Sequence, residues 1–118
     1  MISALVASLM FAFGGALFAQ SNAPQYTVDQ AKDHTGEFAT VSGTVTEVYV
    51  SAKGNVFLDF GGSYPHQAFT GVIFSRYAGR FSNVSSYTGK NVAVTGKITL
   101  YAGRPEIIVK LPAQLNVE

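Results

Sequence analysis

The chain has 118 residues, and its 47% hydrophobic content excludes intrinsic disorder and is enough for one packed domain without metal or disulfide support. Eight Lys and Arg residues against seven Asp and Glu residues leave a net charge of +1, far from the strongly basic balance of proteins that depend on phosphate contacts. The absence of cysteine excludes a disulfide scaffold, a thiolate metal site and a lipid attached to a cysteine.

The chain begins with an apolar run. Residues 1–19 contain only two polar side chains, Ser3 and Ser8, and the run ends in the small residue Ala19 before a polar stretch. This pattern is typical of a signal peptide cleaved after Ala19, which predicts a secreted or periplasmic protein. No Lys or Arg precedes the run, so a retained membrane anchor stays an alternative, and only then would the protein contact a membrane.

The next segment leads into the first predicted strand. Residues 20–36 are expected to form a linker and a short helix of one or two turns that stops at Gly36. From 37 to 50, apolar and polar side chains alternate as in a half-buried strand, and the apolar phase slips by one residue before Val48. A β-bulge produces such a slip, so we predict one inside this strand.

Four further strands are predicted at residues 56–60, 68–75, 91–101 and 106–111. In the first of these, Phe57 and Asp59 share the outer face because side chains alternate along a strand. The segment 76–88 lacks strand character and is expected to hold a short helix or a turn. Gly43 and Gly96 lie in the middle of the two long strands, where we interpret them as structural residues that let the strands bend.

Five strands in the order long, short, short, connecting segment, long, short predict an all-β, five-stranded Greek-key barrel, the OB-fold, over residues 37–118. A β-sandwich is the alternative, although it usually has about seven strands. The segments VSGTV at 41–45, GKNVAVTGKI at 89–98 and YAGRPEI at 101–107 resemble the first, fourth and fifth strands of bacterial OB-fold proteins of the nucleic-acid-binding type. The resemblance implies a domain that binds single-stranded nucleic acid.

In OB-folds the ligand lies across the second and third strands, between two of the loops. Mapped onto this chain, that surface collects aromatic and basic side chains, namely Tyr49, Lys53, Phe57, Tyr64, Lys97, Tyr101 and Arg104. Nucleic-acid bases stack on flat rings while cations follow the backbone, so this mixture favours a single-stranded nucleic acid. In a purely structural interpretation, Tyr49 and Tyr101 pack against each other as cross-strand neighbours, and Arg76 and Arg80 form a solvated face.

Residues that could support catalysis are not grouped in the sequence. The two histidines, His34 and His66, lie in separate predicted loops without a carboxylate at metal-ligand spacing. The acids of the predicted strands, Glu47, Asp59 and Glu106, form no cluster in the sequence. We therefore expect a non-catalytic protein without a metal or a cofactor. The alternative function is an extracytoplasmic binding module for a small molecule, a glycan or a protein partner, which the signal-like segment and the near-neutral charge favour.

Overall fold

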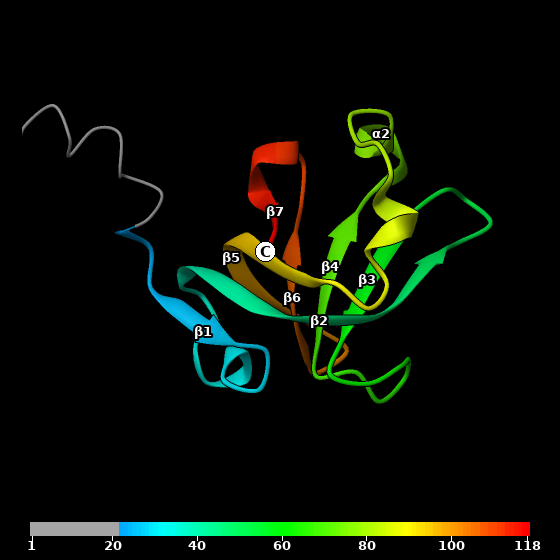
Figure 1. Cartoon of the computed structure of the whole chain (residues 1–118). Helices are drawn as coiled ribbons and strands as arrows, with labels where there is room; N and C mark the ends of the chain where they lie inside the picture. Colours follow the sequence, from blue (N-terminus) through cyan, green and yellow to red (C-terminus); the bar gives the residue numbers. More distant parts are fainter. Residues whose placement is uncertain (1–21) are drawn as a thin grey trace, which may run out of the picture.

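The computed structural model describes residues 22–118, and the predicted signal peptide lies outside this range (Figure 1). The elements are β1 (Gln25–Thr27), the 3-10 helix η2 (Ala31–Asp33), β2 (Phe38–Val50), β3 (Val56–Phe60), β4 (Phe69–Ile73), α2 (Ser75–Ala78), the 3-10 helix η3 (Val84–Tyr87), β5 (Asn91–Tyr101), β6 (Arg104–Ile108), the 3-10 helix η4 (Pro112–Gln114) and β7 (Leu115–Val117). No helix within residues 22–118 is long and apolar enough to cross a bilayer.

Five of the strands close into a ring. The strand order is β1-β2-β3-β4-β6-β5-β7, and an additional pairing between β2 and β5 joins the two long strands to each other. All five predicted strands are present and all belong to this ring, which is consistent with an OB-fold-like architecture. The structure has seven strands, the usual number in a β-sandwich. All seven belong to one sheet, however, and the pairing between β2 and β5 closes it, so there are not two separate sheets.

Two three-residue strands were not predicted. β1 pairs in parallel with the start of β2, and β7 pairs in antiparallel with the start of β5. The expected helix after residue 26 is reduced to η2, because Tyr26 belongs to β1 and stacks on His34 with 3.7 Å between ring centroids. The Tyr26 hydroxyl also donates to Glu37, and Ala31 is fully buried, so residues expected to form a linker pack onto the ring.

The bulge predicted in the first long strand is confirmed. The register between β2 and β3 shifts between Val45 and Glu47, which face Phe60 and Asp59 on consecutive positions of β3. An extra residue on one strand rotates the following side chains to the other face. The bulge therefore brings the end of β2, from Glu47 onward, onto the face that carries Asp59.

The core fills the inside of the ring. Its largest fully buried side chains are Phe60, Phe69, Leu58, Ile73, Ile98 and Ile107. The two mid-strand glycines are required by close packing against this core. A Cβ atom on Gly96 would lie 2.6 Å from Cγ2 of Ile107, and one on Gly43 would lie 2.7 Å from Cγ1 of Val28. Both distances are shorter than real Cβ contacts allow, which explains glycine at these two positions.

The final strand begins two residues earlier than predicted. Ala102 and Gly103 have φ angles of 52° and 78°, as in the two-residue hairpin turns that match the twist of a sheet. This tight turn places Tyr101 directly opposite Arg104, so β6 starts at Arg104 and ends at Ile108. Pro112 begins η4, which leads into β7.

Candidate functional site

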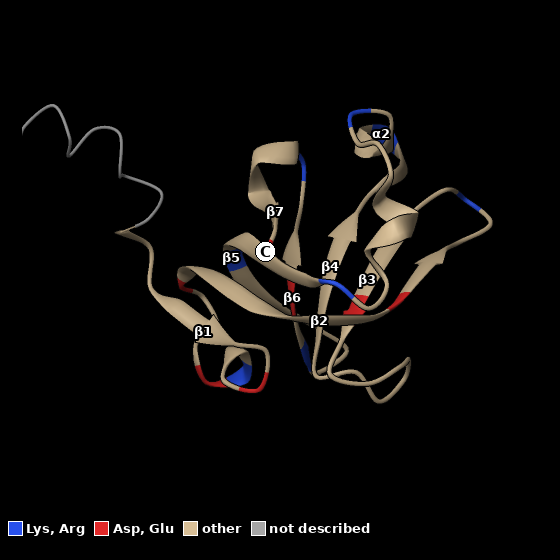
Figure 2. Ribbon diagram, in the orientation of Figure 1, with Lys and Arg blue, Asp and Glu red and all other residues tan. Residues whose placement is uncertain are grey.

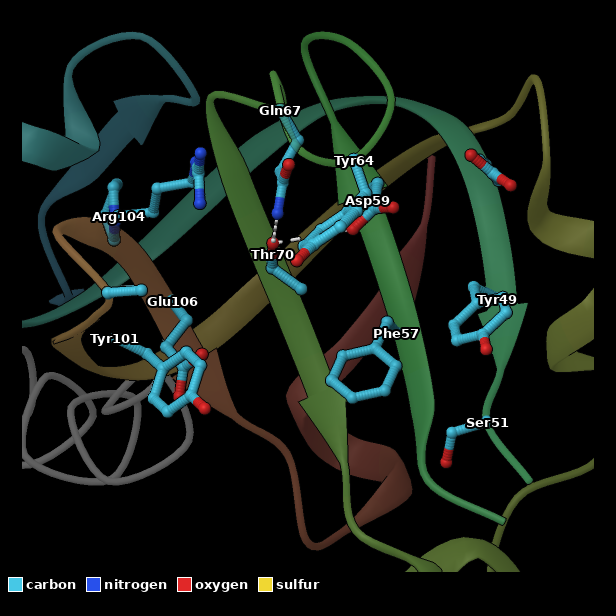
Figure 3. A pocket seen from close by; sticks show the side chains of 13 residues that line it. Tyr49, Ser51, Phe57, Asp59, Tyr64, Gln67, Thr70, Tyr101, Arg104 and Glu106 are labelled. Atoms are coloured by element: carbon cyan, nitrogen blue, oxygen red, sulfur yellow. Dashed lines mark hydrogen bonds between the residues drawn. The ribbon is translucent and has the colours of Figure 1, made fainter. Parts of the chain in front are cut away.

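The outer face of the ring carries a cleft of about 640 Å³, lined by residues of β2, β3, β4, β5, β6 and the loops beside them (Figure 3). Five of the seven predicted site residues line it, namely Tyr49, Phe57, Tyr64, Tyr101 and Arg104. Four of these residues lie on four different strands of the ring, β2, β3, β5 and β6, and Tyr64 lies in the loop between β3 and β4. Sequence periodicity and the OB-fold expectation therefore located this face.

The two predicted lysines are not in the cleft. Lys53 lies in the turn between β2 and β3, just beyond the cleft residue Ser51. Lys97 lies on β5 opposite Phe38, where β5 pairs with β2 rather than with β6. Arg104 is therefore the single Lys or Arg side chain among the described residues that line the cleft.

Three of the four aromatic rings of the cleft are exposed, and Phe57 is half-buried. Tyr49 and Phe57 are cross-strand partners with 6.1 Å between their ring centroids and an angle of 28° between the ring planes. Tyr49 therefore forms a cross-strand pair, as the structural interpretation expects, but its partner is Phe57 and not Tyr101. Tyr64 and Tyr101 are each 73% exposed, so their faces are free to accept a flat ligand.

A row of acidic residues crosses the floor of the cleft. Glu47 pairs with Asp59, Asp59 pairs with Thr70, and Thr70 pairs with Glu106, each on the next strand of the ring. All four side chains line the cleft, and Figure 2 shows the acids of β2, β3 and β6 crossing the ring together. Residues scattered over 60 positions of sequence thus form one acidic row on the face expected to be aromatic and basic.

The surroundings disfavour ionisation of two of these acids. Burial raises the pKa of Asp59 above its ordinary value, and the charge of Glu47 raises it further. Hydrogen bonds from the Thr70 hydroxyl and the Tyr64 backbone oppose the shift without cancelling it. Burial also raises the pKa of Glu106. Both carboxyl groups therefore take up a proton more readily than an exposed acid does.

Gln67 and Thr70 connect to Asp59 through hydrogen bonds. The Nε2 group of Gln67 donates to Oγ1 of Thr70 at 3.2 Å, and that hydroxyl donates to Oδ1 of Asp59 at 3.5 Å. Gln67 is only 9% exposed, and its Oε1 atom has no hydrogen-bond partner. Because buried polar atoms are nearly always paired in folded proteins, this unpaired acceptor at the edge of the cleft requires an explanation.

Comparison with one solved structure supports the fold. A crystal structure assigned to aspartyl-tRNA synthetase of Leishmania major Friedlin aligns over 81% of this chain, with a TM-score of 0.56 and 9% sequence identity. A structure of asparaginyl-tRNA synthetase from Pyrococcus horikoshii aligns over 73% of the chain with 16% identity and a TM-score of 0.49. The chain spans 21% and 20% of these two proteins. No protein-family model and no curated protein sequence matches the chain.

Three cations lie around one tyrosine of α2, Tyr77. The guanidinium carbons of Arg76 and Arg80 each lie 5.0 Å from the ring centroid of Tyr77, and Nζ of Lys110 lies 5.9 Å from it. A hydrogen bond with Arg76 is the main cause of a lowered pKa for Tyr77. Within residues 22–118 the one ion pair is formed by a histidine, so none of these cations has an acidic partner there. We call these four residues the Tyr77 cation cluster.

The start of α2, which carries Arg76 and Tyr77 of the cation cluster, contacts the turn at one end of the cleft. The backbone N–H of Ser75, at the start of α2, donates to Oδ1 of Asn55 in the turn between β2 and β3, and Ser51 at the start of that turn lines the cleft. Figure 2 shows the Lys and Arg residues of α2 and of this turn on the same side of the ring. Arg76 and Arg80 are both exposed, as the interpretation of a solvated face expects, and both lie against the ring of Tyr77.

No arrangement typical of a metal centre occurs within the described part of the chain. Residues 22–118 contain no group of three His, Cys, Asp or Glu side chains that could hold a metal ion. The one histidine–carboxylate contact there joins Nδ1 of His34 to Oε2 of Glu37 at 2.7 Å. Glu37 also accepts from Tyr26, and these hydrogen bonds lower its pKa. This group holds η2 against β2 and lies apart from the cleft.

Sequence reasoning missed the polar floor of the cleft. Glu106 could have been found, because it lies two residues from Arg104 on one strand and therefore shares its face. Asp59 was placed on the outer face with Phe57 but was not connected to other acids. The roles of Gln67 and Thr70 could not be predicted from the sequence, because a loop glutamine and a strand threonine are common residues. Only their hydrogen bonds in the folded structure connect them to Asp59.

Proposed function

We propose that this protein is a non-catalytic binding domain for single-stranded nucleic acid, located outside the cytoplasm. The observation that carries the proposal is the set of aromatic rings on one face of an OB-fold-like ring: the exposed Tyr49, Tyr64 and Tyr101 and the half-buried Phe57. Stacking on aromatic side chains is worth about 1–3 kcal/mol per base and tolerates any sequence. Arg104 adds one cation directly opposite Tyr101.

The Tyr77 cation cluster supports the same function. Its cations lack acidic partners within residues 22–118, so they can contact phosphate groups without first breaking an ion pair. Because the cluster adjoins the end of the cleft near Ser51, bases in the cleft and phosphates at the cluster can belong to one strand. The acidic row repels phosphate from the cleft floor, which favours a strand bound with its bases inward.

The fold likeness is compatible with this proposal. The aspartyl-tRNA synthetase that the chain resembles acts on an RNA, and this chain matches about a fifth of that protein. At 9% identity the likeness concerns the fold, so the ligand is inferred from the rings and the cations of this chain.

The proposal is tested by titrating the full chain into a fluorescent single-stranded oligonucleotide at low salt and measuring anisotropy. Tyr101→Ala removes one stacking surface and should weaken binding by about 1–3 kcal/mol. Phe38→Ala is the matched control, because Phe38 is 62% exposed and lies outside the cleft. Equal losses in the two variants, or no anisotropy change with the unaltered chain, would contradict the proposal.

A second candidate function is an extracytoplasmic module that binds a small molecule, a glycan or a protein partner. The acidic row favours it, since Glu47, Asp59 and Glu106 face a single Arg104 in the cleft. Carboxylates accept hydrogen bonds from sugar hydroxyls and from amines. A thermal-shift screen against glycans and small ligands separates the two functions: stabilisation by one of these, without oligonucleotide binding, favours the second.

A further inference from the structure

The hydrogen bonds below the cleft have a fixed direction. An ionised carboxylate can only accept, and a hydroxyl has one proton, so the Thr70 hydroxyl donates to Asp59 and accepts from Gln67. The Gln67 amide must then present Nε2 to Thr70, which leaves its Oε1 atom without a donor. The unpaired acceptor of Gln67 is thus a consequence of the carboxylate of Asp59.

The floor of the cleft consequently contains many acceptors and few donors. Glu47, Asp59 and Glu106 line it, and Gln67 adds an unpaired carbonyl oxygen while being nine-tenths buried. The Arg104 guanidinium is the one cationic donor among the described lining residues. A ligand that enters this cleft is bound most favourably if it carries N–H groups.

The rings restrict the shape of that ligand. Tyr49 and Phe57 are a stacked pair near the Glu47 and Asp59 end of the acidic row, and Tyr101 lies near the other end, beside Glu106 (Figure 3). A flat group stacked on these rings directs its edge toward the carboxylates. A nucleobase with an exocyclic amino group is flat and carries N–H donors on that edge, and carboxylates are the side chains that accept from the amino group of cytosine.

We propose that the cleft selects nucleobases that carry an exocyclic amino group, as cytosine does, over uracil and thymine, which present carbonyl oxygens at that position. The selectivity rests on the proposed function, since it concerns which bases of a bound strand enter the cleft. Glu106 and Asp59 accept from the amino group, and Gln67 offers a further acceptor. In uracil and thymine a carbonyl oxygen takes this position. It cannot donate a hydrogen bond to these protein oxygens, so these bases bind less tightly.

The test compares short cytosine and uracil deoxy-homopolymers of equal length, bound to the full chain at neutral pH and low salt. The two strands carry the same phosphate charge, so the ratio of their affinities reports on the bases. We expect cytosine to bind about tenfold tighter or better. Glu106→Gln introduces an amide N–H that can donate to the uracil carbonyl, so the ratio should fall toward one.

Two further variants secure the interpretation. Asp59→Asn makes the same exchange on β3 and should lower the ratio in the same way, even if Glu106→Gln fails to fold. Asp33→Asn changes an exposed acid of η2 outside the cleft and should leave the ratio unchanged.

The outcomes separate the two proposals. Equal binding of both homopolymers by the unaltered chain overturns the base selectivity and leaves nucleic-acid binding intact. Binding of neither homopolymer overturns the proposed function. If a lysine homopolymer binds in that case, the acidic row serves a cationic protein partner, and the base selectivity is overturned as well.

Discussion

At the scale of single residues, Asp59 is an acidic side chain that is almost completely buried. It is only 3% exposed and lies beside Glu47 in the acidic row. Burial and this neighbouring charge both raise its pKa above the ordinary value of 3.8. The folded state therefore binds a proton at Asp59 more tightly than the unfolded chain does, so the ionised group destabilises the fold at neutral pH.

Asp59→Asn should consequently stabilise the protein at neutral pH. The amide oxygen can still accept from the Thr70 hydroxyl, while the buried charge is removed. As the pH falls through the raised pKa of Asp59 toward 3.8, the unaltered protein gains the proton and its disadvantage disappears. Urea unfolding at neutral and acidic pH measures both effects.

The exposed acid Asp33 provides the control for this prediction. Asp33→Asn should change the free energy of unfolding little at either pH, because Asp33 is exposed on η2 and its removal relieves no buried charge. A lower stability of Asp59→Asn at neutral pH would show that the carboxylate makes contacts which outweigh its burial.

At the scale of elements, the two long strands cross the core where glycine allows a close approach. Gly96→Ala would place a methyl group 2.6 Å from Cγ2 of Ile107, a fully buried side chain with no room to move away. We expect a loss of about 1–3 kcal/mol in the free energy of unfolding, as for other overpacked cores. Gly79→Ala is the matched control, because no atom lies within 4 Å of its added methyl group and its φ is −65°. A similar loss in both variants, measured by urea unfolding, would contradict this packing explanation.

The elements that the sequence predicted are those with long, regular patterns. Residues 91–101 alternate over their whole length, and β5 has these bounds. The bulge was visible because the phase slip before Val48 interrupts such a pattern. β1 and β7 were missed because three residues are too few for alternation to be distinguished from chance.

The aromatic residues and Arg104 of the candidate site were predicted from the sequence, and its acidic row was not. Tyr101 and Arg104 could be placed together because only two residues separate them in the sequence and the OB-fold expectation assigned both to one surface. The acidic row depends on the pairing of β2, β3, β4 and β6, which joins Glu47 to Glu106 across the sheet. No local pattern reveals such long-range neighbours, so a face expected to be aromatic and basic proved to be aromatic and acidic.

At the scale of the whole molecule, charges of opposite sign occupy different places (Figure 2). Acids cross the cleft floor, whereas Arg76, Arg80 and Lys110 gather around Tyr77. The net charge of +1 conceals this separation. Attraction to a polyanion should therefore depend on a few residues at one end of the cleft and not on the molecule as a whole.

Removing two of these cations should change how binding depends on salt. If Arg76 and Arg80 contact phosphates, the double variant Arg76→Ala/Arg80→Ala should bind oligonucleotides more weakly, and the slope of log affinity against log salt should fall by roughly 0.7 per lost contact. Anisotropy titrations at several salt concentrations measure the slope. Lys32→Ala/Lys97→Ala removes the same charge outside the cleft, and an equal change in slope for both variants would contradict a localised phosphate site.

The brevity of β1 and β7 has a consequence for how this protein can meet other chains. They are the outermost strands of the sheet, and each contributes three residues, while the strands between them are paired on both sides. Short edge strands offer few unpaired backbone groups to an incoming strand, which is one way in which natural sheets avoid joining edge to edge into larger aggregates. Recognition is thereby left to side chains on the open face, and the main chain contributes little to it.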